Sequence, residues 1–595
     1  MMSPTRTQGT AHPTPAAAEL PDADTVVAHT LLNCLLREVS GPEHQTAASD
    51  GHLLLRLPRR GVVLRVALRR TSLLGAHRFT GPVHEQRDGT WERIEWRRLA
   101  GYVQDELSAR TGVRNDEFLD QIASSHQAVT AALAARTTGT GDQDAGDQDT
   151  AGQDTYLASE QSLLFGHRFH PTPKARTGDA ASWLAYAPEI GAAFPLRHLA
   201  VREDLIIEET AEPTATAPLD RLADARAGDV PDGYRLLPAH PWQYEMLAGH
   251  PALRAALDRG DILDLGPGGT PFAATASVRT LYDRETFLKF SLNVRITNCL
   301  RKNASYELSG AVALTRLLGP ALDELTVRFP GSAMLREPAY RSLALPGPDG
   351  DPDRGLLEGF GVIVREGLAT RILPGTTPLL AAAVADEYLS GPGHLSRLLG
   401  GAGPGTALDW WSAYLRLLVP PVLAAYFDHG LVLEPHLQNV VVCVDDDSMP
   451  AQVLFRDLEG TKLLPEHHAD TLAALPAEVA GPMTYDAERG WDRVVYCLFV
   501  NHIAEMLAAV ADLHPETEPA LWAQVRSTLQ TYADRHGCPP RLAALLAGVP
   551  LPAKANLLTR WERKADREAG YVRLPSPFAE DVLSGASDDS WSHAR

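Results

Sequence analysis

The chain has 595 residues, of which 44% are hydrophobic and 22% charged, a composition typical of a globular protein with roughly two to four domains. Its formal net charge of −20 argues against a nucleic acid or an anionic membrane as the main partner. The five cysteines are far apart and form no CxxC pair, so nothing supports a disulfide framework or a zinc or iron–sulfur cluster, and reduced thiols in a cytoplasm fit best. We find no signal-peptide pattern and no run of about 18 apolar residues, and we therefore expect no membrane span.

The N-terminal quarter of the chain predicts a disordered tail followed by a small domain. Residues 1–20 are rich in Thr, Pro and Ala, with little to bury, and are expected to be disordered. A helical apolar pattern over 24–39, short strands over 51–80 and two amphipathic helices then predict a mixed domain over 21–155. The domain ends in residues 137–155, where Gly-Asp-Gln-Asp occurs twice. That stretch predicts a flexible acidic surface loop at a domain boundary.

A loop dense in basic side chains follows at residues 166–178. Two prolines forbid a helix there and fix the backbone, while His167, His170 and Lys174 supply donors within a few residues of one another. The two histidines alone suggest a metal, but no third ligand follows at metal-binding spacing. A rigid basic loop instead favours binding of a phosphate or a carboxylate. The alternative is an ordinary surface loop with incidental histidines.

Residues 275–303 predict an antiparallel hairpin with one polar, cationic face. Apolar and polar residues alternate strictly from Leu288 to Thr297, which is the period of a half-buried strand. Thr297 or Asn298 would then cap a helix, with Arg301 in its first turn, where free N–H groups favour an anion. The polar side chains that would meet there are Ser277, Arg279, Lys289, Thr297 and Arg301. An anion site and a solvated sheet face with scattered charge both remain open on the pattern alone.

From about Leu379 the pattern becomes helical, interrupted by a cluster of oxygen-bearing residues. The motif His436-x-x-Asn439, a strand, a turn of three Asp, a second strand and Asp457 resembles the way kinase-like folds place their metal ligands. The cluster comprises Glu434, His436, Asn439, Asp457 and Glu459. Oxygen donors suit Mg²⁺ far better than zinc. The alternative is a hairpin with ordinary turn acids.

Taken together, these motifs resemble one enzyme family. They are Gly166-His-Arg-Phe-His-Pro-Thr-Pro-Lys174, Leu237-Pro-Ala-His-Pro-Trp242, Ser277-Val-Arg-Thr280, Lys289 to Arg301, Glu434-Pro-His-Leu-Gln-Asn439, Arg456-Asp-Leu-Glu-Gly460 and Lys554-Ala-Asn-Leu-Leu-Thr-Arg560. In order and spacing the chain resembles the NIS (non-ribosomal-peptide-synthetase-independent) siderophore synthetases of the IucA/IucC type over roughly residues 156–565. Residues 1–155 match only loosely, and Arg168 stands where the family usually has proline.

The resemblance implies an α+β fold of cupped-hand architecture. Its parts would be an N-terminal thumb over 21–155, an antiparallel-sheet fingers domain over 156–378, and a largely helical palm over 379–595 that carries the kinase-like hairpin. ATP and Mg²⁺ would bind between fingers and palm, in a cytoplasmic homodimer without nucleic-acid or membrane partners. The implied reaction adenylates a carboxylate of citrate or a related polycarboxylic acid, releases pyrophosphate and condenses the acid with an amine or alcohol. No Ser-His-Asp or Cys-His arrangement points to a covalent acyl-enzyme instead.

The resemblance also implies a role for each motif residue. ATP would be bound by His167, His170, Lys174, Ser277, Arg279, Lys289, Arg301 and Asn439. The carboxylates would be bound by Thr297, Arg301, His436 and Lys554, and the metal by Glu434, Asn439, Asp457 and Glu459. Arg301, His436 and Lys174 would be the catalytic residues.

Two other functions stay open at this point. The His436–Asn439–Asp457 spacing also fits a small-molecule phosphotransferase, which would release ADP rather than AMP and pyrophosphate. A ferric-siderophore-handling, reductase-like protein is the third hypothesis, weakened by the isolated Cys497 and Cys538. The sequence leaves open the amine or alcohol, the siderophore, and whether the acid is free citrate, a citrate monoamide or another dicarboxylate.

Overall fold

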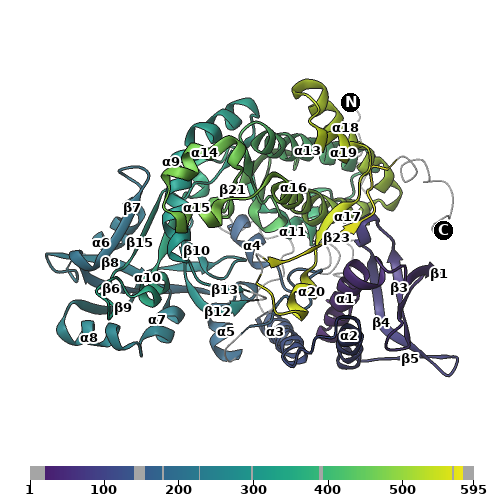
Figure 1. Cartoon of the computed structure of the whole chain (residues 1–595), viewed down its shortest axis with the longest axis horizontal. Coiled ribbons are helices and arrows are strands. Elements are labelled where there is room, and N and C mark those ends of the chain that lie inside the picture. The colour runs from purple at the N-terminus through teal and green to yellow at the C-terminus, as the bar shows by residue number, and fades with distance from the viewer. Residues whose placement is uncertain are drawn as a thin grey trace, which may run out of the picture.

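The chain is described by a computed structural model covering residues 20–139, 154–176, 180–226, 228–296, 299–386, 393–565 and 568–579. The architecture is mixed α+β, as predicted, and its three larger sheets have five, eight and four strands (Figure 1). The predicted disordered tail, apart from its last residue, and the Gly-Asp-Gln-Asp repeat lie outside the described residues, so those two interpretations stay predictions.

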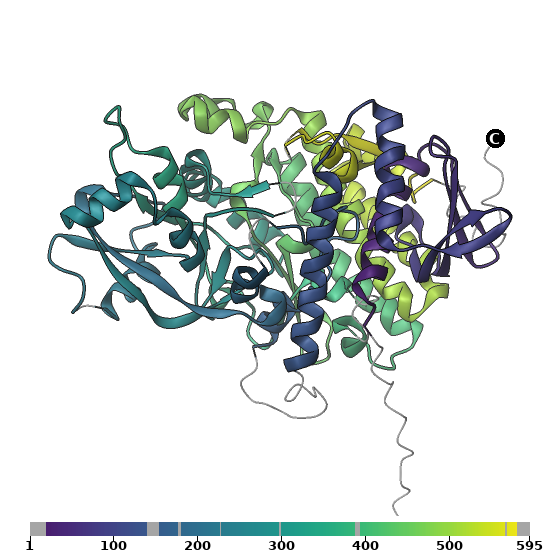
Figure 2. The same ribbon diagram turned by 90° about the horizontal axis from the view of Figure 1, so that it is seen from below.

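The N-terminal unit consists of three helices and an antiparallel meander of five strands. Its elements are α1 (Ala23–Leu35), the π-helix η1 (Leu36–Ser40), β1 (Thr46–Ser49), β2 (His52–Leu57), β3 (Val62–Arg70), η2 (Leu73–Gly75), β4 (Arg78–Arg87), β5 (Thr90–Arg93), α2 (Trp96–Thr111) and α3 (Phe118–Gly139). Leu557 and Trp561 of α20 (Asn556–Trp561), near the other end of the chain, belong to the same hydrophobic core. Figure 2 shows α3 on the side of this unit that faces the eight-stranded sheet.

The eight-stranded sheet is antiparallel, in the order β7-β15-β16-β11-β10-β9-β6-β8. Its strands are β6 (Ala193–Arg202), β7 (Ile206–Thr210), β8 (Tyr234–Ala239), β9 (Ile262–Ala274), β10 (Thr280–Tyr282), β11 (Phe287–Phe290), β15 (Ala339–Leu343) and β16 (Val362–Arg365). Around it lie α4 (Thr155–Gln161), α5 (Ala180–Tyr186), η3 (Pro188–Ile190), η4 (Glu203–Leu205), α6 (Ala217–Asp224), α7 (Pro241–Leu247), α8 (Pro251–Arg259), α10 (Arg354–Phe360) and η5 (Leu368–Thr370). The predicted hairpin is confirmed in part: β10 and β11 pair antiparallel, with Thr280 opposite Lys289, but Ser277 and Arg279 precede β10 rather than lying in it.

The predicted helix beginning at Thr297 or Asn298 is wrong. Both residues lie outside the described part of the chain, and helix α9 (Ser305–Arg328) begins several residues later. The alternating strand breaks after Phe290, and a second small hairpin, β12 (Leu292–Ile296) with β13 (Cys299–Arg301), carries Arg301 in a strand opposite Leu292. Asn303 then anchors the chain ahead of the helix, because its side-chain amide donates to the carbonyls of Lys289 and Gly361, both at 3.2 Å.

The remaining sheet joins the two halves of the molecule. Its order is β14-β20-β19-β17, and β14 is parallel to β20. The short connection from β14 to β15 leads from this sheet into the eight-stranded sheet, because β15 pairs with β7 there. Its strands are β14 (Ser332–Met334), β17 (Thr377–Leu380), β19 (Val440–Val444) and β20 (Pro450–Phe455), and two-stranded ribbons are formed by β18 (Leu431–Val432) with β21 (Lys462–Leu463) and β22 (Leu551–Lys554) with β23 (Tyr571–Leu574).

Helices form most of the C-terminal part, as predicted from about Leu379. They are α11 (Ala381–Ala385), α12 (His394–Leu398), α13 (Pro404–Phe427), η6 (Leu437–Asn439), η7 (Leu458–Gly460), α14 (Pro465–Ala474), α15 (Ala477–Met483), α16 (Ala487–Val495), the π-helix η8 (Tyr496–Ile503), α17 (Ala504–Leu513), η9 (Pro515–Thr517), α18 (Glu518–His536) and α19 (Pro540–Leu546). The predicted domain boundaries themselves stay predictions.

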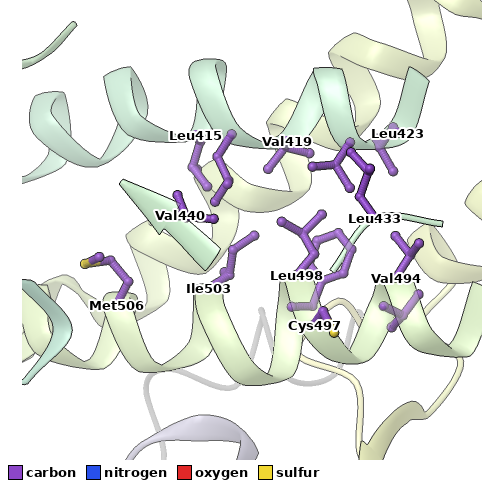
Figure 3. Close-up of a cluster of buried hydrophobic side chains, with 14 of the residues drawn as sticks. Leu415, Val419, Leu423, Leu433, Val440, Val494, Cys497, Leu498, Ile503 and Met506 are labelled. Carbon is purple, nitrogen blue, oxygen red and sulfur yellow. The ribbon is translucent and has the colours of Figure 1, made fainter. Parts of the chain in front are cut away.

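The core of this part is built around α13 and the continuous helix α16–η8–α17. Figure 3 shows Leu415 and Val419 of α13 on one side of the cluster and Leu498 and Ile503 of the second helix on the other. The second helix, Ala487–Leu513, is long and apolar enough to cross a membrane, but its most apolar window is completely buried inside the molecule. It is therefore a core element of a folded domain.

Candidate active site

The predicted cluster of oxygen-bearing residues lies at one end of the β19–β20 hairpin. Val440 pairs with Phe455, and Arg456 donates its backbone N–H to the carbonyl of Asn439 at 3.0 Å. The residues before β19 and after β20 are therefore neighbours, as the spacing predicts. Asp457 adopts the left-handed conformation (φ 75°, ψ 55°), a rare backbone state for a non-glycine residue that is found preferentially at functional sites.

Cations of the eight-stranded sheet meet this end of the hairpin directly. Lys289 on β11 lies with its Nζ 2.5 Å from Asp457 Oδ1 and 2.7 Å from Glu459 Oε1. Arg279, immediately before β10, lies 3.4 Å from Glu459 Oε1, and its guanidinium also hydrogen-bonds the side chain of Asn303. The two sheets are thus joined through charged side chains that the sequence assigned to phosphate and to metal.

Two residues that the sequence did not single out complete this ion cluster. Glu337 lies in the connection from β14 to β15, and its carboxylate accepts from Arg365 at the end of β16 at 2.6 Å. Arg365 also lies 2.6 Å from Asp457 Oδ1, and the backbone N–H of Glu459 donates to Glu337 Oε2 at 3.0 Å. Lys289 lies 3.9 Å from Glu337. Three cations therefore face three carboxylates, which is the pairing that buried charges require.

Burial and pairing shift the pKa values of these groups in different directions. Burial disfavours the charged form of Lys289, but Asp457 and Glu459 more than offset it and raise the pKa of the lysine. Burial also disfavours the carboxylate of Asp457, yet Lys289 and Arg365 hold its pKa well below the usual range. Burial raises the pKa of Glu459 to about 7 against the pull of Lys289, and one of its oxygens, Oε2, is buried without a hydrogen-bond partner. Asp457 is thus the permanent anion of the pair.

Glu434 and His436 lie beside this cluster. Burial disfavours the carboxylate of Glu434, but Arg493, 2.7 Å from its Oε1, lowers the pKa of the acid below the usual value. Asn439, the third member of the loop, donates from its side-chain amide to the carbonyl of Glu434 at 3.3 Å. Burial lowers the pKa of His436 to about 4, so its imidazole is neutral near pH 7.

The unengaged oxygens of two acids converge next to Gly460. The ion pairs of Asp457 use Oδ1 and those of Glu434 use Oε1. Asp457 Oδ2 and Glu434 Oε2 each lie 3.9 Å from the position that a Cβ on Gly460 would occupy. Two hard oxygen donors therefore flank a point kept open by a glycine, which suits Mg²⁺ shared with phosphate oxygens. Within the described ranges, no group of three or more His, Cys, Asp or Glu is arranged to hold a metal ion, so the chain alone forms no complete cage.

The basic loop divides between this site and a separate structural contact. His167 is exposed, and its Nε2 lies 2.8 Å from the side-chain nitrogen of Asn501. The pKa of His167 is lowered by desolvation and by the neighbouring groups His170, Arg37, His436 and Lys554. His170 is buried, and its Nδ1 accepts from the backbone of Thr172. Lys174 instead lies 3.1 Å from Glu189 and donates to the carbonyl of Leu163, deep under the loop.

The other predicted residues occupy several places. Ser277 lies in the tight turn before β10, where its hydroxyl accepts from the backbone of Thr280 at 3.0 Å. Lys554 ends β22, and its charge is among the causes that lower the pKa values of His167 and His436. Arg301 lies in β13, and Thr297 is outside the described residues. The structure therefore brings together Lys289, Arg279, Asp457, Glu459, Glu434, Asn439, His436, His167 and Lys554. Lys174 instead lies in a separate ion cluster, where it shares Glu189 with Arg176.

The fold and its relatives define the class of protein. The fold matches the ATP-bound structure of aerobactin synthetase IucA from Klebsiella pneumoniae, with a TM-score of 0.81 over 93% of this chain and 99% of that one, at 24% identity. The chain is 29% identical to the rhizobactin siderophore biosynthesis protein RhbC of Rhizobium meliloti, over 95% of this chain and 99% of the relative. It is 31% identical to the L-2,3-diaminopropanoate–citrate ligase of Staphylococcus aureus, over 72% of this chain and 75% of that relative. The class is the ligases of siderophore biosynthesis.

The chain belongs to the IucA/IucC family. The sequence model of that family matches residues 155–386, which include the basic loop and the cationic hairpin. A second model, described as ferric iron reductase FhuF-like transporter, matches residues 408–569. Its region holds Cys443, Cys497 and Cys538, of which the first two are buried and the third is exposed, and the described residues contain no cluster of metal-binding side chains that would suit a redox centre. The resemblance inferred from the motifs is confirmed.

Proposed function

We propose that the chain adenylates a carboxylate of citrate, or of a related polycarboxylic acid, with ATP and condenses it with an amine or alcohol. The observation that carries the proposal is the ion cluster in which Lys289 and Arg279 of one sheet meet Asp457 and Glu459 of the other, beside Glu434 and the neutral His436. A relative of 31% identity is named as a ligase of citrate and an amine, and this supports the choice of substrates.

The chemistry follows from the charges involved. A carboxylate oxygen of the acid attacks the α-phosphorus of ATP, an oxygen–phosphorus bond forms, and the bond to the β-phosphate breaks to release pyrophosphate. The nucleophile then attacks the acyl carbon, AMP leaves, and the proton of the amine or alcohol passes to solvent. Two polyanions must approach each other in the first step, so fixed cations near both are the main catalytic requirement.

We assign the residues on that basis. Lys289, Arg279, Ser277 and His167 bind the phosphates, and Arg301, Thr297, His436 and Lys554 receive the carboxylates of the acid. Lys174 is given no phosphate contact, since its ammonium already has Glu189 and a backbone carbonyl as partners. Binding of Mg·ATP would exchange partners within the cluster: cations turn to phosphate, and released carboxylate oxygens turn to the metal, so that the buried charges stay balanced.

Magnesium fits the donor set of Asp457 and Glu434, with Asn439 and Glu459 next to them. When bound there, it would neutralise phosphate charge and favour departure of pyrophosphate. The point beside Gly460, where Asp457 Oδ2 and Glu434 Oε2 converge, supports this assignment, and completion of the shell by phosphate oxygens and water is the usual habit of Mg²⁺.

The finer architecture belongs to the same proposal. In the cupped-hand description, the N-terminal unit is the thumb, the eight-stranded sheet the fingers and the helical part the palm, with the kinase-like hairpin β19–β20 at the palm edge of the site. We further propose a cytoplasmic homodimer. Buried, reduced cysteines such as Cys34 and Cys497 agree with a reducing compartment.

A phosphotransferase remains the second candidate, because the hairpin geometry at Asn439 and Asp457 also suits transfer of the γ-phosphate. Nucleotide analysis separates the two. Citrate, its monoamides and other polycarboxylates are each incubated with ATP, Mg²⁺ and hydroxylamine, which traps an activated acid as a hydroxamate. AMP and pyrophosphate in proportion to hydroxamate support the ligase, whereas ADP in proportion to product refutes it. Exchange of labelled pyrophosphate into ATP with the acid alone would identify the adenylate step, and a panel of amines and alcohols would then identify the nucleophile.

A further inference from the structure

The π-helix η8 places two consecutive polar side chains, Asn501 and His502, next to the apolar run 497–500 of a core helix. Asn501 and His502 lie within the helix Ala487–Leu513, whose most apolar window is fully buried. A π-helix is rare, and such turns within α-helices occur frequently at functional sites because the extra residue redirects the side chains. Here both side chains leave the apolar packing and reach the loop that carries His436.

His502 holds the residue before His436. Its Nδ1 lies 2.8 Å from the carbonyl oxygen of Pro435, and its Nε2 lies 2.5 Å from the hydroxyl of Tyr414. A carbonyl only accepts, so Nδ1 carries the proton, and Nε2 accepts from the tyrosine hydroxyl. Burial lowers the pKa of His502 to about 3, which agrees with a neutral ring of this one tautomer. The ring is completely buried, so the hydrogen bond to Pro435 is shielded from water.

Asn501 lies between the residue after His436 and the basic loop. Its side-chain amide is 3.4 Å from the backbone nitrogen of Leu437 and 2.8 Å from His167 Nε2. The backbone N–H of Phe169 donates to His167 Nδ1 at 3.0 Å, which orients the ring within the basic loop. The backbone N–H of Leu437 donates to Asn501 Oδ1, and Asn501 Nδ2 faces His167 Nε2, so this one side chain contacts both loops.

The backbone on both sides of His436 is thus contacted by η8, and the same turn contacts His167. We propose that Asn501 and His502 are positioning residues that fix His436, and with it the carboxylate subsite, relative to His167. This inference rests on the proposed function, because it assigns His436 to the acid substrate. Neither residue needs to touch a substrate. They act by holding the loop at residues 434–439 and the basic loop in one arrangement.

Two near-isosteric substitutions of His502 separate this role from simple packing. In His502→Asn the side-chain amide occupies the place of Nδ1 and keeps a donor for Pro435, whereas in His502→Gln it occupies the place of Nε2 and keeps only the Tyr414 side. Tyr414→Phe is the matched control, since it disturbs the same buried pair without touching the loop. Hydroxamate formation is measured with the full chain at varied acid and varied ATP, and thermal unfolding is measured in parallel.

We expect His502→Gln to raise the KM for the acid, or lower kcat, by about 3- to 10-fold, the effect of one lost hydrogen bond, with the KM for ATP nearly unchanged. His502→Asn and Tyr414→Phe should both stay within about twofold of wild type in these constants. Equal losses in all three variants would overturn the proposal, because packing alone would explain them, and so would wild-type kinetics in a folded His502→Gln protein. Failure of the proposed function is separate, since it would appear as absence of AMP-forming turnover in the wild-type enzyme.

Discussion

Removal of the Lys289 ammonium is the most direct test of the ion cluster. The side chain of Lys289 is 3% exposed, and its Nζ contacts Asp457 and Glu459 at 2.5 and 2.7 Å. Removal of one partner from a buried ion pair costs roughly 3–5 kcal/mol, because a charge is left uncompensated. Arg365 and Arg279 would still face the two acids. We therefore expect Lys289→Met to lower the free energy of unfolding by about 3 kcal/mol, the lower end of that range.

The size of this loss should depend on pH in a definite direction. Burial raises the pKa of Glu459 to about 7, and removal of the lysine charge would raise it further. A carboxyl group whose pKa is higher in the folded than in the unfolded protein binds a proton on folding, so its unfavourable effect is absent below the unfolded pKa, grows as pH rises from the unfolded to the folded pKa, and is constant above it. The cost of Lys289→Met should therefore be larger at about pH 8 than at about pH 5.5.

Urea unfolding followed by tryptophan fluorescence measures both effects, and Glu459→Gln is the control. The double variant Lys289→Met with Glu459→Gln removes the stranded acid together with the lysine, so we expect it to be more stable than Lys289→Met alone by about 1–2 kcal/mol at pH 8, a coupling typical of groups in contact. Because Lys289 is assigned to the phosphates, Lys289→Met should also weaken ATP binding, and the double variant should not recover it. The reasoning would be refuted by a pH-independent loss together with additive effects of the two substitutions.

Three further substitutions test neighbouring parts of the site. Gly460→Ala places a methyl group at an ordinary contact distance of 3.9 Å from both acids, so we expect a folded protein that needs several-fold more Mg²⁺ for half-maximal activity; an unchanged Mg²⁺ titration would contradict the metal assignment. Glu189→Gln leaves Lys174 without its carboxylate partner and should lower the free energy of unfolding by roughly 3 kcal/mol, while the KM for ATP stays the same. A raised KM for ATP at unchanged stability would instead indicate that Lys174 binds the phosphates. Arg493→Met removes the main charge that lowers the pKa of Glu434, so the pKa of Glu434 should rise. The acid limb of the pH–activity profile should therefore shift to higher pH than in wild type, and an unshifted profile would argue against a charged Glu434.

The sequence predicted those parts of the site that depend on local pattern. Alternation identified β11 with Lys289 on it, although the strand ends at Phe290 and not at Thr297. The spacing around the β19–β20 hairpin brought Asn439 next to Arg456, the residue before Asp457. Both are short-range consequences of strand periodicity and turn closure. The mixed α+β class and the family followed from the same motifs.

The sequence pattern could not predict ion-pair partners that lie far apart in the chain. Lys289 and Asp457 are 168 residues apart, and Glu337 occupies a connection between two sheets that no periodicity marks. The helix start failed for a similar reason. Asn303 is fixed by carbonyls of two distant strands, and the first helical turn uses Glu307, which accepts from the backbone of Ala304 at 2.9 Å. The tertiary contacts of Asn303 therefore fix the chain ahead of α9, and the capping contact lies at Ala304 rather than at the predicted Thr297 or Asn298.

Exposure separates the acids of the cluster by function. Glu337 is completely buried and is bonded to Arg365 and to a backbone N–H, so it is a fixed counter-ion for the cations of the eight-stranded sheet. Glu459 has an 8% exposed side chain, whereas that of Asp457 is 31% exposed. A metal shared with substrate phosphates must reach its ligands from the open side, and charged oxygens bind it best. Asp457 satisfies both conditions, because Lys289 and Arg365 keep it ionised through one oxygen while the other faces Glu434 across Gly460. Lys289 and Arg365 thus hold Asp457 charged and oriented at a partly exposed position that a substrate can reach.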